Sequence, residues 1–326
     1  MRKTGLIIFT CAIFGCCTNN PPIHKVFSTP GSALEMNAVS FTSESKGYLV
    51  TSDKNEMTIW ETTDAGTTWQ KMFEWYGMEY YDPRRLHAIY PIGSRVFGMA
   101  APMGGFPSGF VYDDNTRQLM ELEIPLDESP QVQWASFDCY HYYLSDDSGS
   151  YEAIVDTLGQ MERRPANRDI SKLRQIEGTK DCEYWIRYDK DSLYYQGAGS
   201  ISAIYIPEPE KVAVFGNDVI IASLMEDGRR TINSMDIVDK TVNEIYEVEG
   251  YQFVEKVLVS SDSIVLIVAN TAGIWGTSAD IIYSLDGGRK WRKKVIGMQI
   301  DCSCLVGSDF YFGSFLGGLY KVHLGK

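Results

Sequence analysis

Two stretches of the chain share one pattern of turn-forming residues, Ser/Thr-x-Asp-x-Gly-x-x-Trp, and each lies between segments in which apolar and polar residues alternate. The pattern comprises Thr62, Asp64, Gly66 and Trp69 in the first copy and Ser284, Asp286, Gly288 and Trp291 in the second. An Asp in a tight turn accepts hydrogen bonds from backbone N–H groups of that turn, and the hydroxyl group adds another. The Gly supplies a backbone of positive φ at little steric cost, and the Trp ring packs back over the sheet. The pattern therefore predicts two structural hairpin turns.

These stretches resemble the Asp-box (BNR) repeat of sialidase-like and photosystem-assembly-factor-like β-propellers. The resemblance implies an all-β fold in which the box turns lie away from the face that binds ligands. We therefore interpret both boxes as structural staples. The alternative is a sugar site in which the carboxylate acts beside the aromatic ring.

The spacing of the boxes predicts the number of blades. The two Asp residues are 222 positions apart, a span that holds five steps of about 44 residues, the usual length of a propeller blade. Four short strands fit each of six windows, at residues 38–75, 86–124, 132–163, 172–206, 211–248 and 255–296. Three further strands are expected at 299–305, 309–313 and 318–323, and a spare strand at 23–28 supplies the partner that they lack. We therefore predict a seven-bladed β-propeller closed by an N-terminal strand, because closure removes free sheet edges; six blades are the alternative.

The N-terminal segment has the features of an export signal. Arg2 and Lys3 precede an apolar run over residues 5–14, which is too short to span a bilayer as a helix. The run ends in Ile-Phe-Gly-Cys, which resembles a bacterial lipobox. The resemblance implies that Cys16 is acylated, and Cys17 offers a second register.

We accordingly divide the chain into a signal peptide of lipoprotein type at 1–15, a tether at 16–22 and a single β-propeller domain at 23–326. No Asp directly follows the two cysteines. The resemblance to lipoproteins therefore implies an exported protein anchored in the outer membrane, on its periplasmic or its surface side.

The charge of the chain restricts its partners. The net charge is −13, and removal of residues 1–15, which hold two basic residues and no acidic one, leaves −15. A domain this acidic repels nucleic acid and anionic lipid. We therefore expect no nucleic-acid partner and membrane attachment through the acyl chains alone. We also expect a monomer.

The sequence predicts neither a metal site nor a cofactor. Cys302 and Cys304 share one face of a strand, but no second Cys or His pair accompanies them at ligand spacing, so we interpret both as small buried hydrophobic residues. The pairing of Cys139 with Cys182 stays open. No phosphate-binding loop or dinucleotide-binding fingerprint occurs.

The candidate binding residues lie in loops rich in aromatic and Arg side chains, a composition typical of recognition surfaces. In propellers generally, ligands bind on the face opposite the box turns, where the loops between second and third strands and the connections between blades meet. The candidates on that face are Trp75, Tyr76, Tyr80, Tyr81, Arg84, Arg85, Phe106 and Trp275. The alternative is that these rings pack over the blade ends.

Three classes of function compete. The resemblance to assembly-factor propellers favours a non-enzymatic module that binds an envelope protein, and this is our prediction. The alternatives are a glycan-binding lipoprotein and a sialidase-like glycoside hydrolase. The hydrolase needs an arginine triad and paired carboxylates, and the Arg-Ile-Pro tripeptide of sialidases does not occur here. Acidic residues in predicted loops, such as Asp82, Asp146, Asp147 and Glu226, have no spacing that pairs them.

Overall fold

The computed structural model describes residues 22–28, 34–53, 56–76, 86–92, 94–103, 106–123, 134–138, 141–146, 149–155, 161–165, 174–175, 185–188, 192–197, 200–205, 209–251, 253–270, 278–314 and 317–325. All the regular elements in these ranges are β-strands. A search of the described residues for a helix able to cross a membrane finds none. The described strands form seven four-stranded antiparallel sheets, which we call blades 1 to 7.

Within each blade, consecutive strands pair with one another. Blade 1 contains β2 (Glu35–Phe41), β3 (Gly47–Asp53), β4 (Glu56–Thr62) and β5 (Gln70–Tyr76), and blade 2 contains β6 (Leu86–Ile92), β7 (Arg95–Met103), β8 (Phe106–Asp113) and β9 (Gln118–Glu123). Blade 3 contains β10 (Trp134–Asp138), β11 (His141–Asp146), β12 (Gly149–Val155) and β13 (Met161–Pro165), and blade 4 contains β14 (Arg174–Gln175), β15 (Trp185–Tyr188), β16 (Ser192–Gly197) and β17 (Ser200–Tyr205). Blade 5 contains β18 (Pro209–Phe215), β19 (Asp218–Leu224), β20 (Arg230–Asp236) and β21 (Val242–Val248), and blade 6 contains β22 (Phe253–Ser260), β23 (Ser263–Asn270), β24 (Ser278–Ser284) and β25 (Arg292–Met298). Blade 7 combines β26 (Cys302–Val306), β27 (Asp309–Ser314) and β28 (Gly318–His323) with the N-terminal strand β1 (Ile23–Phe27).

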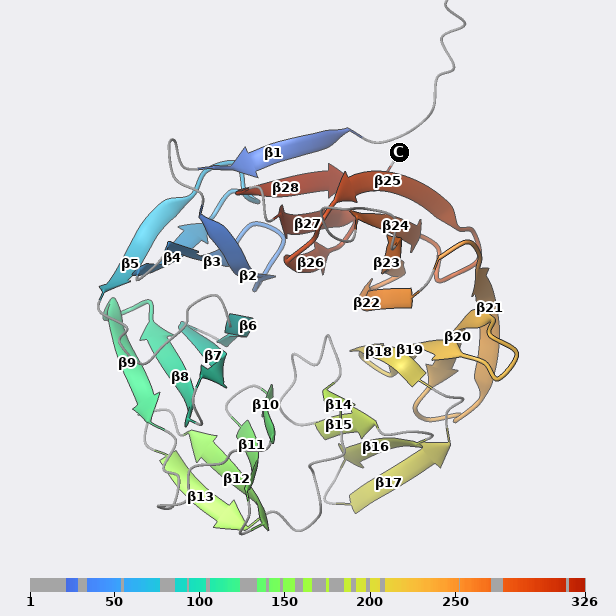
Figure 1. The fold of residues 1–326 in the computed structure, drawn as a ribbon, viewed down its shortest axis with the longest axis horizontal. Helices are drawn as coiled ribbons and strands as arrows, with labels where there is room; N and C mark the ends of the chain where they lie inside the picture. Colours follow the sequence, from blue (N-terminus) through green and yellow to red (C-terminus); the bar gives the residue numbers. More distant parts are fainter. Residues whose placement is uncertain are drawn as a thin grey trace, which may run out of the picture.

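The blades are arranged in a ring around a central axis (Figure 1), so the predicted all-β propeller is confirmed. The first strand of each blade is innermost and the last is outermost. Blade 7 departs from this chain order because its outermost strand is β1, which pairs antiparallel with β28 from Ile23↔Val322 to Phe27↔Leu319. The N-terminal strand thus closes the ring, as the spare strand at 23–28 predicted.

The hydrophobic core lies between neighbouring blades. Blades 1 and 2 share a buried cluster that includes Tyr48, Ile59, Phe110 and Tyr112. Equivalent clusters lie between blades 5 and 6, between blades 6 and 7, and between blades 7 and 1. Because blade 6 is covered on both sides by these clusters, its middle strand β24 is buried along nearly its whole length.

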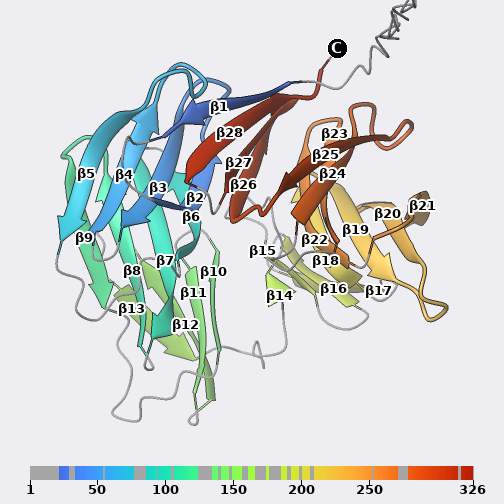
Figure 2. The same ribbon diagram turned by 45° about the horizontal axis from the view of Figure 1, so that its top comes forward.

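The strand directions define two faces of the ring, which Figure 2 shows obliquely. The turns between first and second strands and between third and fourth strands lie on one face, which we call the box face because both Asp boxes connect third to fourth strands. The remaining loops and the blade-to-blade connections lie on the opposite face. Ile23 pairs with Val322 near the end of β28, so the chain enters the propeller on the box face.

Three inner strands begin two or three residues before their predicted starts at 38, 211 and 255. Each contains a β-bulge near its beginning, at Asn37 in β2, Glu210 in β18 and Glu255 in β22. A bulge inserts one extra residue and interrupts the alternation of side chains. The sequence pattern therefore shows these strands only after the bulge.

Candidate functional site

The first box turn is held by its own side chains. Asp64 Oδ1 accepts hydrogen bonds from Thr62 Oγ1 (2.9 Å) and from the backbone N of Thr68 (2.8 Å). Thr68 Oγ1 donates to Asp64 Oδ2 (2.6 Å), and Gly66 N donates to Thr62 Oγ1 (2.9 Å). Trp69 Nε1 donates a hydrogen bond to the carbonyl of Gly66 (3.1 Å). The hydrogen bonds from Thr68 hold the pKa of Asp64 below its usual value, so this carboxylate stays ionised and bound within its turn.

The second box repeats this arrangement. Asp286 Oδ1 accepts from Ser284 Oγ (2.9 Å) and from the backbone N of Lys290 (2.8 Å). Gly288 N donates to Ser284 Oγ (2.9 Å), and Trp291 Nε1 donates to the carbonyl of Gly288 (2.8 Å). The backbone N–H at the position before Trp is used in both turns, whereas a side-chain bond from that position to the Asp occurs in the first box, from Thr68.

Each box also connects its blade to the blade before it. The Trp291 ring stacks on Tyr246 of blade 5, with centroids 4.6 Å apart. Tyr311 of blade 7 donates its hydroxyl to the carbonyl of Ala65 in the first box (2.8 Å). The boxes thus fasten blade 6 to blade 5 and blade 1 to blade 7, which supports the structural interpretation over a sugar site.

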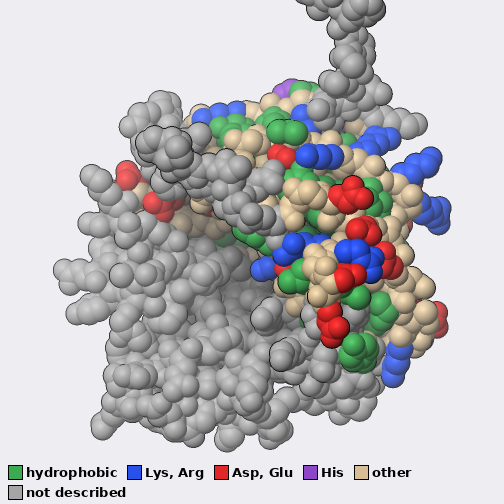
Figure 3. Space-filling model, turned by 45° about the vertical axis from the view of Figure 1, so that its right-hand side comes forward, with side chains coloured by type: hydrophobic (Ala, Val, Ile, Leu, Met, Phe, Trp, Pro, Cys, Tyr) green, Lys and Arg blue, Asp and Glu red, His purple; other side chains and the backbone are tan. Residues whose placement is uncertain are grey.

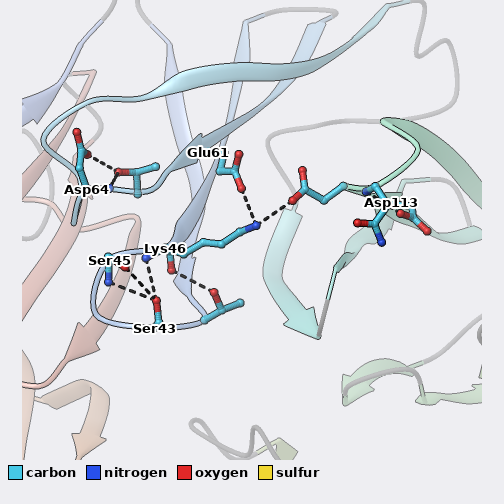
Figure 4. Close-up of polar contacts among 10 residues, drawn as sticks. Ser43, Ser45, Lys46, Glu61, Asp64 and Asp113 are labelled. Carbon is cyan, nitrogen blue, oxygen red and sulfur yellow. Dashed lines mark hydrogen bonds and ion pairs between the residues drawn. The ribbon is translucent and has the colours of Figure 1, made fainter.

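Lys46 makes a further connection on the box face (Figure 4). Its Nζ lies 2.8 Å from Glu61 Oε1 in the same blade and 2.8 Å from Asp114 Oδ2 in blade 2. Burial opposes the charge, but the hydrogen bonds to Asp114 and Glu61 outweigh it and raise the pKa of Lys46. Lys46 therefore joins blade 1 to blade 2 and offsets part of the charge of its two carboxylate partners.

On the opposite face, a polar network links blades 5 and 6. Arg230 forms a two-pronged ion pair with Glu210, with Nε–Oε2 at 3.0 Å and Nη2–Oε1 at 3.2 Å. Tyr251, in the connection between the blades, donates its hydroxyl to Asp280 Oδ2 (2.9 Å). The ammonium group of Lys293 lies 4.6 Å from the centre of the Tyr251 ring and 3.6 Å from Asp280 Oδ2. These contacts fix the side chains before any ligand arrives.

Beside this network lies an open hollow of about 480 Å³, lined by Glu210, Lys211, Phe253, Val254 and Glu255 at the beginnings of β18 and β22. Phe253 is half-buried, and Lys211 is exposed. Burial raises the pKa of Glu255, and the charge of Lys211 partly opposes this. Acidic and basic side chains are intermixed over the described part of the surface (Figure 3). The hollow thus combines an aromatic ring with charges of both signs.

Asp301 lies on the same face, in the connection between blades 6 and 7. It precedes β26, and burial raises its pKa to about 6. Gln299 donates a hydrogen bond to its Oδ1 (3.1 Å), which partly opposes the shift, whereas the charge of Glu35 at the start of β2 adds to it. Asp301 therefore changes its charge close to neutral pH.

Sequence reasoning missed the hollow because two of its residues are bulge residues. Glu210 and Glu255 occupy matching positions at the beginnings of β18 and β22, where the alternation is interrupted. If β18 and β22 are aligned on Pro209 and Val254, their first buried residues, Glu210 and Glu255 fall at the same position. This alignment would have placed both acids at the same edge of the ring.

The binding residues predicted from the sequence are not placed by the structure. The backbones of Trp75 and Tyr76 lie in β5 and that of Phe106 lies in β8, but their side chains are outside the described part of the chain. The residues wholly outside it are Cys16, Tyr80, Tyr81, Arg84, Arg85 and Trp275, together with Cys139 and Cys182.

Chemically, the described site is suited to recognition. The carboxylates of Glu210 and Asp280 are engaged by Arg230 and by Tyr251 and Lys293. Among the described residues, no three His, Cys, Asp or Glu side chains gather closely enough to hold a metal ion. Cys302 is buried, which raises the pKa of its thiol to about 12 and leaves it in the unreactive protonated form.

Comparisons with known proteins extend the description of the fold. No protein-family model matches the sequence, and no curated protein is similar to it in sequence. A virginiamycin B lyase from Staphylococcus aureus has a similar structure, with a TM-score of 0.62 and 10% identity over 93% of this chain and 99% of that chain. A chain of the mitotic checkpoint complex matches with a TM-score of 0.57 and 12% identity, covering 100% of this chain and 99% of that one. The WD40 domain of SCAP from fission yeast matches at 0.51 and 9% identity, over 94% and 98%. At these identities the similarity establishes the propeller fold alone.

Proposed function

We propose that this protein is an exported, lipid-anchored β-propeller that binds an envelope protein through its opposite face and catalyses no reaction. The observation that carries the proposal is the hollow around Phe253, which is bordered by the network from Glu210 to Lys293. An aromatic anchor with fixed polar groups at its rim is the composition of protein-binding surfaces.

The same contacts argue against hydrolysis of glycans at this site. A glycosidase needs two carboxyl groups about 5–10 Å apart, one protonated to act as acid. Burial raises the pKa of Glu255, as an acid requires, but the other acidic residue that lines the hollow, Glu210, is paired with Arg230. Asp280, beside the hollow, accepts hydrogen bonds from Tyr251 and from the backbone of Ile296. Glu255 therefore lacks a second free carboxylate among these residues.

The remaining parts of the proposal rest on the sequence. Cys16 would carry the acyl chains after removal of residues 1–15, residues 16–22 would form the tether, and residues 23–326 would form the propeller. The outer membrane is the proposed location. The shared hydrogen-bond pattern of the two box turns supports assignment to the Asp-box propellers. Because the chain enters at the box face, the opposite face would point away from the anchor.

A quantitative pull-down tests this function. Tagged protein is isolated from detergent-solubilised envelopes and compared with a hollow variant, Lys211→Gln/Phe253→Ala/Glu255→Gln, and with a control, Val238→Ala/Lys240→Gln, in an exposed turn of blade 5 on the box face. We expect one protein in stoichiometric amount, retained by the control and lost from the hollow variant. Equal capture by the hollow variant would contradict the site, and absence of any protein would contradict the function and favour glycan binding.

A further inference from the structure

The two box turns differ in charge although Asp64 and Asp286 accept the same hydrogen bonds from the hydroxyl group and from the backbone. The positions that hold Thr67, Thr68 and Gln70 in blade 1 hold three basic residues in blade 6, which we call the basic ridge: Arg289, Lys290 and Arg292. All three are exposed, and within the described part of the chain none makes an ion pair with an acidic side chain. The fold needs only the backbone at these positions, so it does not account for the three charges.

Asp286 offsets part of the charge of the basic ridge. It lies in the same turn, and the backbone N–H and the charge of Lys290 both lower its pKa, so it stays ionised and leaves these four residues, three basic and one acidic, with a net charge of +2. Asp262, in the neighbouring turn, contacts the box through its carbonyl, which accepts from Gly287 N (2.9 Å).

The basic ridge lies on the same face as the point where the chain enters the propeller. It belongs to a turn between third and fourth strands, and such turns lie on the box face. Ile23 pairs with Val322 at the box-face end of blade 7. Twenty-two residues precede Ile23 in the sequence, and any anchor within them joins the fold on the face that carries the ridge.

We propose that the basic ridge is a docking surface for anionic lipid headgroups, which orients the anchored propeller with its box face on the bilayer and its opposite face outward. This inference rests on the proposed acyl anchor. The net charge of the whole chain does not prevent it, because charges more than about 8 Å apart in water are largely screened at physiological salt. Each net positive charge close to an anionic surface strengthens association roughly fivefold, so a net charge of +2 strengthens it roughly 25-fold. Attachment would thus involve more than the acyl chains expected from the net charge.

The test uses the full acylated protein on phosphatidylcholine vesicles with and without about 30% phosphatidylglycerol, which supplies the anionic headgroups. Flotation reports the anchor. Amide hydrogen exchange of residues 284–292 reports the docking surface, and the loop 225–229 on the opposite face is the internal reference. The variant Arg289→Gln/Lys290→Gln/Arg292→Gln is compared with Arg229→Gln, which removes an exposed basic residue on the opposite face.

We expect flotation with both vesicles and exchange at 284–292 that is slower by roughly tenfold or more only on anionic vesicles. The slowing should disappear in the ridge variant and in 0.5 M salt, and it should persist in the control variant. Flotation with equal exchange on both vesicles would overturn the docking surface and leave the anchor standing. Failure to float on neutral vesicles would overturn the anchor, while flotation on anionic vesicles that requires the ridge would still support the surface.

Discussion

At the scale of single residues, the box turns depend on two positions of positive φ. Ala65 and Gly66 have φ of 57° and 78°, and Gly287 and Gly288 have 67° and 87°. Gly288 also lies against blade 5, where a Cβ atom would come within 2.7 Å of Ile245 Cδ1. The glycine is therefore required both by the turn and by the contact between blades.

Comparison with Gly228 separates the cost of the backbone conformation from the cost of the contact between blades. Gly228 has φ of 85°, but no atom lies within 4 Å of the place where its Cβ atom would be. Gly228→Ala should cost about 1 kcal/mol of unfolding free energy through its backbone alone. Gly288→Ala should cost about 1 kcal/mol more, because the methyl group displaces Ile245. Urea denaturation measures both, and an Ile245→Ala background should remove the difference. Equal losses in the original background would contradict the packing role.

Asp301 gives a prediction for pH dependence. Its pKa is raised from 3.8 to about 6 in the folded protein, so the unfolded chain releases this proton at lower pH than the folded one. The contribution of Asp301 to stability therefore falls as pH rises from about 4 to about 6. Asp301→Asn should leave the melting temperature unchanged below pH 4 and raise it relative to the original protein above pH 6. A constant difference across this range would show that the carboxyl group is not perturbed.

At the scale of elements, the beginnings of the inner strands shape the opposite face. Bulges at Glu210 and Glu255 turn these side chains toward the hollow, and Arg230 from the third strand of blade 5 holds the first of them. Bulges commonly re-aim side chains in this way next to functional sites. The proposed recognition surface is therefore produced by interruptions of the strand pattern.

Two neighbouring arginines allow the contribution of this network to the unfolding free energy to be measured. Arg230 and Glu210 have side chains 16% and 21% exposed, whereas Arg229 and Asp227 are 47% and 56% exposed. Arg230→Gln should lower the unfolding free energy by about 1–2 kcal/mol because it leaves a half-buried carboxylate without its partner. Arg229→Gln should leave the unfolding free energy unchanged within the error of the measurement, because solvent screens that pair. Chemical denaturation measures both variants. If the two substitutions lower the unfolding free energy by similar amounts, the network does not order the surface.

At the scale of the whole molecule, stability depends on closure by β1. Phe27 packs edge-on against Trp60, with centroids 4.9 Å apart, and also approaches Trp69 of the first box. The N-terminal strand thus joins blade 7 to blade 1 as well as completing blade 7. The contacts of β1 and those of the first box therefore stabilise the same seam, the interface between blades 7 and 1.

Phe27→Ala should therefore lower the unfolding free energy by about 2 kcal/mol, since a half-buried aromatic ring is lost. His24→Ala, at an exposed position of the same strand, should change it by less than about 0.5 kcal/mol. Thermal and urea unfolding of both variants check this. If the two substitutions have the same effect, the seam does not depend on the N-terminal strand.

Much of the fold was predictable because its signals are local and periodic. The two boxes and the spare strand at 23–28 led to a closed propeller, and β1 pairs with β28 as expected. The strand starts at β2, β18 and β22 were displaced because bulges interrupt the alternation there. The hollow was not predicted because it joins Lys211 to Phe253 across two blades, and no local pattern records that proximity. The predicted aromatic loops stay a prediction.

The central claim is that the opposite face of blades 5 and 6 contacts an envelope protein. The most direct measurement is photo-crosslinking in living cells with a benzoyl-phenylalanine at Phe253 or, as a control, at Phe215, which is 45% exposed and lies at the box-face end of β18. We predict a protein adduct of one defined size at position 253 and none at position 215. Absence of a protein adduct at 253, or the same adduct at both positions, would contradict the account.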